Sequence, residues 1–168
     1  VYANSEAFKF EFGRSFWRRV ADIPRIICAK YTAVGSVLTD IALSKNRIRF
    51  MPIDGAYYHC ARVDPGFLKA FWTSGALCGP RLAIKLRDEI ARAVKSNDWS
   101  AARVLAERID ATYAPLFPNG SFRDFSMFNI ALEKERINAA GWCKAGPARP
   151  PYHIVPPQYD ENAKRSGR

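Results

Sequence analysis

Short apolar runs recur along the first half of the chain, with polar and amphipathic stretches between them. The runs cover residues 1–2, 26–30, 48–53 and 74–78. Each interval between two runs has room for a helix, and alternating strands and helices are typical of a parallel sheet covered on its faces. The pattern therefore predicts four parallel strands, the first of them cut short.

Three of the intervening stretches are predicted to form short helices, at residues 14–22, 34–43 and 64–72. In the last of these, Asp64 is the expected N-cap and Pro65 the first helical residue, where a missing backbone N–H costs no hydrogen bond. Residues 1–96 are thus expected to form repeated strand–helix units.

Beyond residue 78 the apolar positions follow helical spacing. One stripe consists of Leu82, Leu86, Ile90 and Val94, and a second, capped by Asn97 or Asp98, consists of Trp99, Ala102, Leu105 and Ile109. A third helix is predicted at 126–140, with Gly141 as its C-terminal cap. The Pro-rich tail at 147–157 is expected to be extended. Residues 97–168 therefore form a predicted helical extension with an extended tail.

The composition favours a folded globular domain over a disordered chain or a membrane-spanning protein. The 168 residues are 48% hydrophobic, which suits one packed domain and excludes a disordered chain. No apolar run approaches the roughly 18 residues of a membrane span. The formal net charge is +10, but Lys and Arg alternate with Asp and Glu along the amphipathic segments. This pattern favours a solvated surface over a nucleic-acid partner.

The cysteines and histidines are not grouped in the sequence as metal ligands or catalytic residues would be. The four cysteines lie far apart among apolar neighbours, without a CxxC pair: Cys28, Cys60, Cys78 and Cys143. Free thiols in a reducing cytoplasm are expected, rather than disulfides or a metal site. The two histidines stand alone, so neither a catalytic triad nor a metal centre is predicted.

Lys30 is the residue with the clearest chemical potential. It ends the apolar run that begins at Ile26, where a strand buried on both faces would reach the C-terminal rim of a barrel, and catalytic residues of barrel enzymes lie at that rim. An ammonium group among apolar walls loses hydration and releases its proton more readily, and the free amine can add to a ketone to give an imine. The alternative is a solvated charge at a strand end.

Three further residues gain a possible role beside such a lysine. Tyr2 ends the preceding strand and could move protons to and from the carbinolamine, although a strand-end tyrosine also packs at the rim. Trp72 could offer an aromatic wall and an N–H donor, and Asn129 could bond a hydroxyl group. Packing and capping are the default roles of both.

Several longer motifs follow one another along nearly the whole chain. They are YANSEAFKFEF, IICAKYT, RIRFMPIDGAYY, FWTSGALCGP, LFPNGSFRDFSMFNIALEKERINAAGW and ARPPYHIVPP. In this order they resemble the trans-o-hydroxybenzylidenepyruvate hydratase-aldolases and relatives acting on the o-carboxy substrate, within the N-acetylneuraminate lyase and dihydrodipicolinate synthase superfamily. The resemblance implies an α/β fold, the C-terminal half of a (β/α)8 TIM barrel followed by a C-terminal helical extension.

The resemblance also implies roles for single residues. Lys30 would be the Schiff-base lysine and Tyr2 the proton relay, while Trp72 and Asn129 would contact the substrate. Gly75 would lie on strand eight and line the pocket floor. The implied enzyme is a class I carbon–carbon lyase that needs no cofactor and no metal, because the imine on Lys30 serves as the electron sink.

The implied reaction cleaves an arylidene pyruvate, such as o-hydroxy- or o-carboxybenzylidenepyruvate, to an aromatic aldehyde and pyruvate in polycyclic aromatic hydrocarbon degradation. The full-length protein would be a cytoplasmic tetramer that binds a 2-oxo acid. No GTxGE turn for the pyruvate carboxylate occurs in these residues, so the isolated chain is expected to be inactive. Another pyruvate-dependent lyase or synthase of the superfamily, or a noncatalytic binding module, remains an alternative, and the ring substituent is left open.

Overall fold

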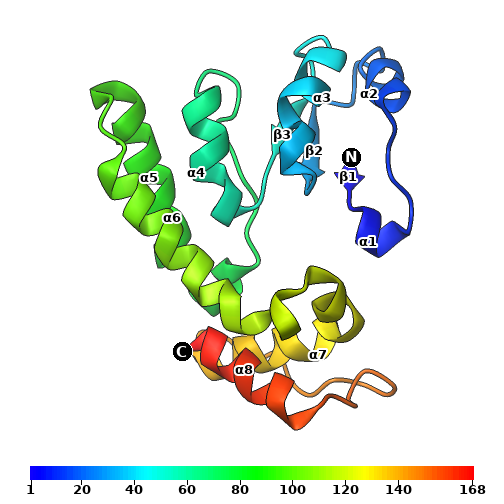
Figure 1. Cartoon of the computed structure of the whole chain (residues 1–168), viewed down its shortest axis with the longest axis vertical. Coiled ribbons are helices and arrows are strands. Elements are labelled where there is room, and N and C mark those ends of the chain that lie inside the picture. The colour runs from blue at the N-terminus through cyan, green and yellow to red at the C-terminus, as the bar shows by residue number, and fades with distance from the viewer. The chain divides into compact units, whose positions relative to one another are not determined.

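The computed structural model describes residues 1–168, which form two compact units. The first unit contains residues 1–73 and 89–106, and the second contains 74–88 and 107–168. Helices α5 (Arg81–Ser96) and α6 (Ser100–Tyr113) are labelled in Figure 1. Each contributes residues to both units. Both helices were predicted from their apolar stripes, and Leu86, Ile90, Ala102 and Ile109 of those stripes are buried.

The first unit is built on a parallel sheet of three strands in the order β1-β2-β3. The strands are β1 (Tyr2–Ala3), β2 (Cys28–Tyr31) and β3 (Arg49–Met51). The helical segments of this part are α1 (Ser5–Phe8), α2 (Arg14–Val20), η1 (Val34–Ser36), α3 (Val37–Leu43) and α4 (Asp54–Val63). Strands therefore alternate with helices, as the apolar runs predicted.

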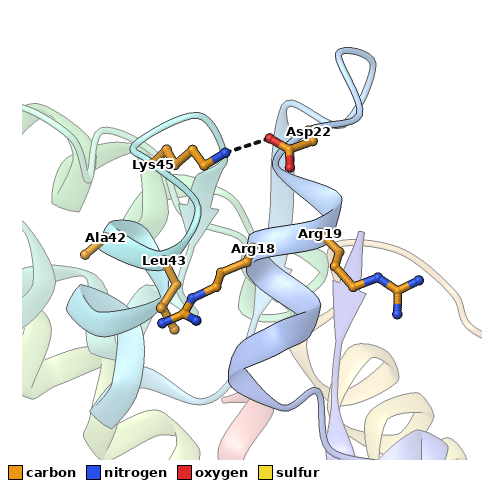
Figure 2. Close-up of a pocket in the computed structure, with 6 residues that line it drawn as sticks. All are labelled: Arg18, Arg19, Asp22, Ala42, Leu43 and Lys45. Carbon is orange, nitrogen blue, oxygen red and sulfur yellow. Dashed lines mark hydrogen bonds and ion pairs between the residues drawn. The ribbon is translucent and has the colours of Figure 1, made fainter.

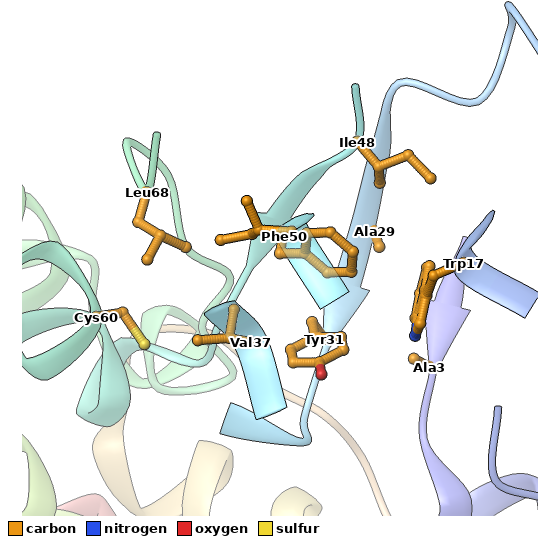
Figure 3. Packing of buried hydrophobic residues seen from close by; sticks show 10 residues of the cluster. Ala3, Trp17, Ala29, Tyr31, Val37, Ile48, Phe50, Cys60 and Leu68 are labelled. Carbon is orange, nitrogen blue, oxygen red and sulfur yellow. The ribbon is translucent and has the colours of Figure 1, made fainter. Parts of the chain in front are cut away.

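The hydrophobic core lies on one face of this sheet. Ala29, Tyr31 and Phe50 point into it from the strands, and Trp17 of α2 meets them, with its ring centroid 5.9 Å from that of Tyr31 and 4.8 Å from that of Phe50 (Figure 3). Burial alternates along β2, where Ala29 and Tyr31 are buried and Cys28 and Lys30 are only half-buried. The expectation of a strand buried on both faces was wrong, because successive side chains point to opposite faces and only one face meets helices of this unit.

One predicted helix is absent, and an unpredicted one precedes it. Residues 64–72 form a turn and an irregular stretch, whereas α4 occupies 54–63. Asp64 does cap a turn, since its Oδ1 accepts from the N–H of Phe67 at 2.9 Å. However, the residue before a proline avoids the helical region, and Asp64 has φ −142° and ψ 79°. The Asp64–Pro65 pair therefore ends α4 and begins no helix.

The predicted strand at 74–78 is also absent. Residues Gly75–Cys78 form a 3-10 turn, η2, and Gly79 follows it with φ 129°. A single parallel bridge between Ile53 and Trp72 takes the place of a fourth strand. The N–H of Gly75 is donated to the hydroxyl of Tyr113 at 3.2 Å. Backbone hydrogen bonds of this stretch are therefore made within the turn and to a side chain, and not to a neighbouring strand.

The second unit is helical. Besides η2 it contains η3 (Ala114–Leu116), η4 (Pro118–Gly120), α7 (Phe122–Ala140) and α8 (Pro157–Gly167). Gly141 ends α7 with φ 70°, as predicted, although α7 begins earlier than expected. The tail has a turn at 150–153 and then α8, so it is not extended throughout. No helix combines the length and the apolar character that crossing a membrane requires.

Candidate active site

The sheet register places Lys30 beside Tyr2. The Cα atoms of Tyr2, Lys30 and Met51 are partners across the three parallel strands. Partners in a parallel sheet direct their side chains to the same face, and this face is opposite to the one that carries Tyr31. The backbone N–H of Lys30 is donated to the carbonyl of Val1 at 2.8 Å, which ties the two strand ends together.

The Lys30 ammonium lies between two aromatic rings. Its Nζ is 4.2 Å from the ring centroid of Tyr2 and 4.1 Å from that of Trp72. Both distances fall within the range of a cation–π contact. No carboxylate forms an ion pair with Lys30, and no hydrogen bond holds its Nζ. The predicted apolar walls around this amine are therefore aromatic faces.

Trp72 is fixed by three hydrogen bonds. Its indole Nε1–H is donated to the carbonyl of Tyr31 at 3.2 Å. Its backbone N–H is donated to Pro52, and its carbonyl accepts from Asp54, both at 2.9 Å. The indole N–H is thus engaged within the protein, so the suggested N–H donor for a substrate is not free. The ring face is what Trp72 presents to Lys30.

Tyr2 has a partner that sequence reasoning missed. The hydroxyl oxygen of Tyr2 accepts from Nδ2 of Asn4 at 2.7 Å. Asn4 is also the N-cap of α1, because its Oδ1 accepts from the N–H of Ala7 at 3.0 Å. Since Asn4 acts as the donor, the hydroxyl proton of Tyr2 stays available for transfer. The Tyr-x-Asn spacing at the end of the first strand was the signal that could have pointed to this pair.

A buried polar cluster lies on the opposite face of β2. The hydroxyl of Tyr31 donates to Oδ2 of Asp40 and lies 2.8 Å from Oγ of Ser36. Asp40, on α3, is only 7% exposed. Burial, and next the hydrogen bond to Asp40, raise the pKa of Tyr31 above its ordinary value of 10.0. Tyr31 therefore stays neutral, and its hydroxyl links β2 to α3 on the face of the sheet opposite Lys30.

Asn129 and Gly75 belong to the second unit. Asn129 is an exposed residue of α7, and Gly75 begins η2. The structure brings Lys30, Tyr2 and Trp72 together, whereas substrate contact by Asn129 and Gly75 stays a prediction from the resemblance. Because the stretch around Gly75 is a turn, its assignment to a strand was wrong.

The first unit also has a pocket away from Lys30. A basic pocket on the first unit is lined by Arg18, Arg19, Asp22, Ala42, Leu43 and Lys45 (Figure 2). The hydrogen bond and charge of Lys45, 2.8 Å away, lower the pKa of Asp22. No group of three or more His, Cys, Asp or Glu side chains is placed to hold a metal ion. Lys30 between the rings of Tyr2 and Trp72 is therefore the candidate active site, because an amine can add to a carbonyl group.

Comparison with known proteins gives this arrangement a context. Over all 168 residues the chain is 54% identical to a trans-o-hydroxybenzylidenepyruvate hydratase-aldolase of Sphingobium xenophagum, and 49% identical to one of Pseudomonas aeruginosa. This chain is a homologue of the hydratase-aldolases. A trans-2'-carboxybenzalpyruvate hydratase-aldolase of Nocardioides sp. strain KP7 is 31% identical. No protein-family model matches the chain.

The hydratase-aldolase likeness extends to the fold. A solved structure described as PhdJ bound to substrate intermediate matches 99% of this chain with a TM-score of 0.91 and 31% sequence identity. The α/β class, half of a (β/α)8 barrel followed by helices, is thereby confirmed. The chain spans about half the length of the hydratase-aldolases it matches, 51% of the Sphingobium xenophagum protein and 51% of the PhdJ chain.

Proposed function

We propose that this chain carries the imine-forming lysine of a class I hydratase-aldolase that converts an arylidene pyruvate to an aromatic aldehyde and pyruvate. The observation that carries the proposal is Lys30 Nζ, held between the rings of Tyr2 and Trp72 without a counterion. The homology to hydratase-aldolases supports the reaction class. The proposal implies a full-length protein about twice as long as this chain, as its relatives are.

The first half-reaction is hydration. The free amine of Lys30 adds to the 2-oxo carbon, and the carbinolamine loses water to give a protonated imine. The iminium withdraws electrons through the conjugated double bond, so water adds at the benzylic carbon while the electron pair moves to the nitrogen as an enamine. Protonation of the carbon next to the imine then restores the iminium and leaves a benzylic alcohol.

The second half-reaction is the carbon–carbon cleavage. The benzylic hydroxyl loses its proton, its oxygen forms the aldehyde C=O, and the electrons of the breaking bond pass to the iminium as an enamine. Protonation at carbon gives the pyruvate imine, which water hydrolyses to pyruvate and free Lys30. Tyr2 is the proposed proton carrier at the carbinolamine steps, because its hydroxyl accepts from Asn4 and retains its own proton. No cofactor is required.

We further propose the o-hydroxy substrate rather than the o-carboxy one. The relatives named for trans-o-hydroxybenzylidenepyruvate are 49% and 54% identical to this chain, whereas the relative named for trans-2'-carboxybenzalpyruvate is 31% identical. From the resemblance alone, Asn129 and Gly75 are proposed to contact this substrate. A homo-oligomer, a tetramer, is proposed on the same basis.

The test is turnover by the full-length protein. With o-hydroxybenzylidenepyruvate we expect release of the aromatic aldehyde and pyruvate in equal amounts, at a higher kcat/KM than with the o-carboxy compound. Lys30→Ala is expected to abolish release, and Lys30→Arg also, because a guanidinium stays protonated and cannot add to a carbonyl. Lys45→Ala, which removes an exposed lysine of the same unit, is the matched control and should keep the wild-type rate. Unchanged turnover in Lys30→Ala would refute the proposal.

A further inference from the structure

We infer that Tyr31 and Asp40 are positioning residues for the imine-forming site, and that they act through the carbonyl of Tyr31 on the indole of Trp72. The inference rests on the proposed function, since it concerns the reactivity of Lys30. Neither residue contacts the amine. Their side chains lie on the core side of β2, whereas Lys30 faces the rings of Tyr2 and Trp72.

The first link is the anchor of the Tyr31 side chain. Its ring packs against Trp17 and Phe50, with ring centroids 5.9 Å and 5.0 Å away. Its hydroxyl donates to Asp40 of α3 and lies 2.8 Å from Ser36 Oγ. Directional bonds at the end of the ring fix the residue more sharply than apolar packing alone, because hydrogen bonds weaken steeply when they are misaligned.

The second link is the burial of Asp40 without a cation. The carboxylate is 7% exposed, and its hydrogen bonds come from the hydroxyls of Tyr31 and Ser36, the latter at 3.4 Å. Taking a carboxylate out of water is costly unless its partners are well placed, and an apolar pair of similar volume would fill the same space. The hydrogen bonds to Asp40 therefore serve to orient the Tyr31 side chain, and they add no buried apolar surface.

The third link joins Tyr31 to the site. Its backbone carbonyl accepts the indole N–H of Trp72 at 3.2 Å, and the ring of Trp72 lies 4.1 Å from Lys30 Nζ. Tyr31 directly follows Lys30 in β2, so one residue sets both the direction of the strand end and the place of the indole. Losing the anchor at the hydroxyl allows the carbonyl to rotate and the ring to move away from the amine.

The experiment compares variants of the full-length protein in two measurements, thermal unfolding and the rate at which borohydride traps pyruvate on the protein. Tyr31→Phe keeps the ring and removes the hydroxyl. Asp40→Asn keeps an acceptor for that hydroxyl. The matched control is Ser44→Ala, because Ser44 is fully buried at the end of α3 and donates to Ile41 at 2.7 Å, without a link to Trp72.

We expect Tyr31→Phe to remain folded and to lower the trapping rate at saturating pyruvate roughly tenfold, since a displacement of about 1 Å at a reacting group can cost ~100-fold. Asn at position 40 should retain most of the rate. Ser44→Ala should lower the unfolding temperature without changing the rate. In a Trp72→Phe background, where no N–H reaches the carbonyl, Tyr31→Phe should cause no further loss, which is the signature of residues that act as one unit.

Three results would overturn the inference: a wild-type rate in Tyr31→Phe, an equal slowing by Ser44→Ala, or fully additive losses in the double variant. If Tyr31→Phe does not fold, Asp40→Ala, which removes the acceptor at position 40, takes its place with the same expected loss. A wild-type protein that traps no pyruvate would instead refute the proposed function, so the two failures are distinguishable.

Discussion

Lys30 differs from the ion-paired lysines of this chain in what surrounds its charge. Lys9, Lys45 and Lys164 each pair with a carboxylate, whereas Lys30 meets two ring faces. A nearby carboxylate would favour the charged ammonium, which cannot attack a carbonyl. A ring face attracts a cation more weakly, by about 0.5–2 kcal/mol, and in the proposed mechanism the rings would meet the ammonium and the iminium alike. The two rings thus contact the Lys30 side chain without an ion pair to its Nζ.

Asn4 is predicted to affect turnover through its hydrogen bond to the Tyr2 hydroxyl. Asn4→Asp keeps the N-cap of α1, because a carboxylate accepts from the N–H of Ala7 as the amide does, but it cannot donate to the Tyr2 hydroxyl and would instead accept a hydrogen bond from it. We expect kcat for aldehyde release to fall at least tenfold, part of the roughly 10²- to 10⁴-fold that a proton carrier contributes. Steady-state kinetics of the full-length variant measures this.

The helix content of the variant serves as the control for the Asn4→Asp experiment. Circular dichroism should be unchanged, and Tyr2→Phe should be impaired at least as strongly. An Asn4→Asp variant with wild-type kcat would show that the Tyr2 hydroxyl needs no donor from Asn4.

At the scale of single elements, the approach of α8 to α7 depends on one glycine. A Cβ atom on Gly167 would lie 2.2 Å from the carbonyl oxygen of Arg136, closer than real Cβ contacts allow. Arg136 is itself buried, and its guanidinium lies 4.6 Å from the ring centroid of Tyr113. The backbone of α7 therefore cannot yield freely, and α8 has to move if a side chain is added.

Gly167→Ala is predicted to loosen α8. We expect a loss of roughly 1–3 kcal/mol in the local stability of this contact, the usual cost of overpacking, seen as faster hydrogen exchange of the amides at 158–167. Gly13→Ala is the control, because a Cβ there meets nothing within 4 Å and φ is −68°. Equal exchange in the Gly167 variant and the wild type would contradict the close contact.

The elements show where sequence patterns suffice and where they do not. The long helices α5, α6 and α7 were predictable because each has apolar positions at helical spacing or a glycine cap. Helix α4 was missed although Tyr57, Tyr58 and Ala61 are buried at helical spacing, because the Asp64–Pro65 pair favoured a helix that begins at residue 64. The run at 74–78 suggested a strand, since a short apolar run does not by itself distinguish a strand from a tight turn.

Part of the candidate site could also be predicted from the apolar runs. Tyr2 and Lys30 each end an apolar run, and neighbouring parallel strands bring such ends together. The bond from Trp72 to the carbonyl of Tyr31 joins residues that are 41 positions apart. It depends on how the chain after α4 returns to the sheet, which no local pattern specifies.

For the molecule as a whole, the amine and its aromatic walls occur within a chain that spans about half the length of its hydratase-aldolase relatives. Lys30, Tyr2 and Trp72 all belong to the first compact unit. In the proposed mechanism imine formation depends on these groups, whereas turnover of an arylidene pyruvate also requires a place for the pyruvate carboxylate. Under the proposed function, this chain supplies the amine, and the complete reaction requires the full-length protein.

The account depends most directly on whether Lys30 is the residue that becomes covalently linked to pyruvate. The decisive measurement treats the full-length protein with pyruvate and borohydride, digests it, and locates the adduct by mass spectrometry. The account predicts a pyruvate-derived adduct on the peptide that contains Lys30, its loss in Lys30→Ala, and its persistence in Lys45→Ala. An unmodified Lys30 under saturating pyruvate, or an adduct on a different lysine, would contradict it.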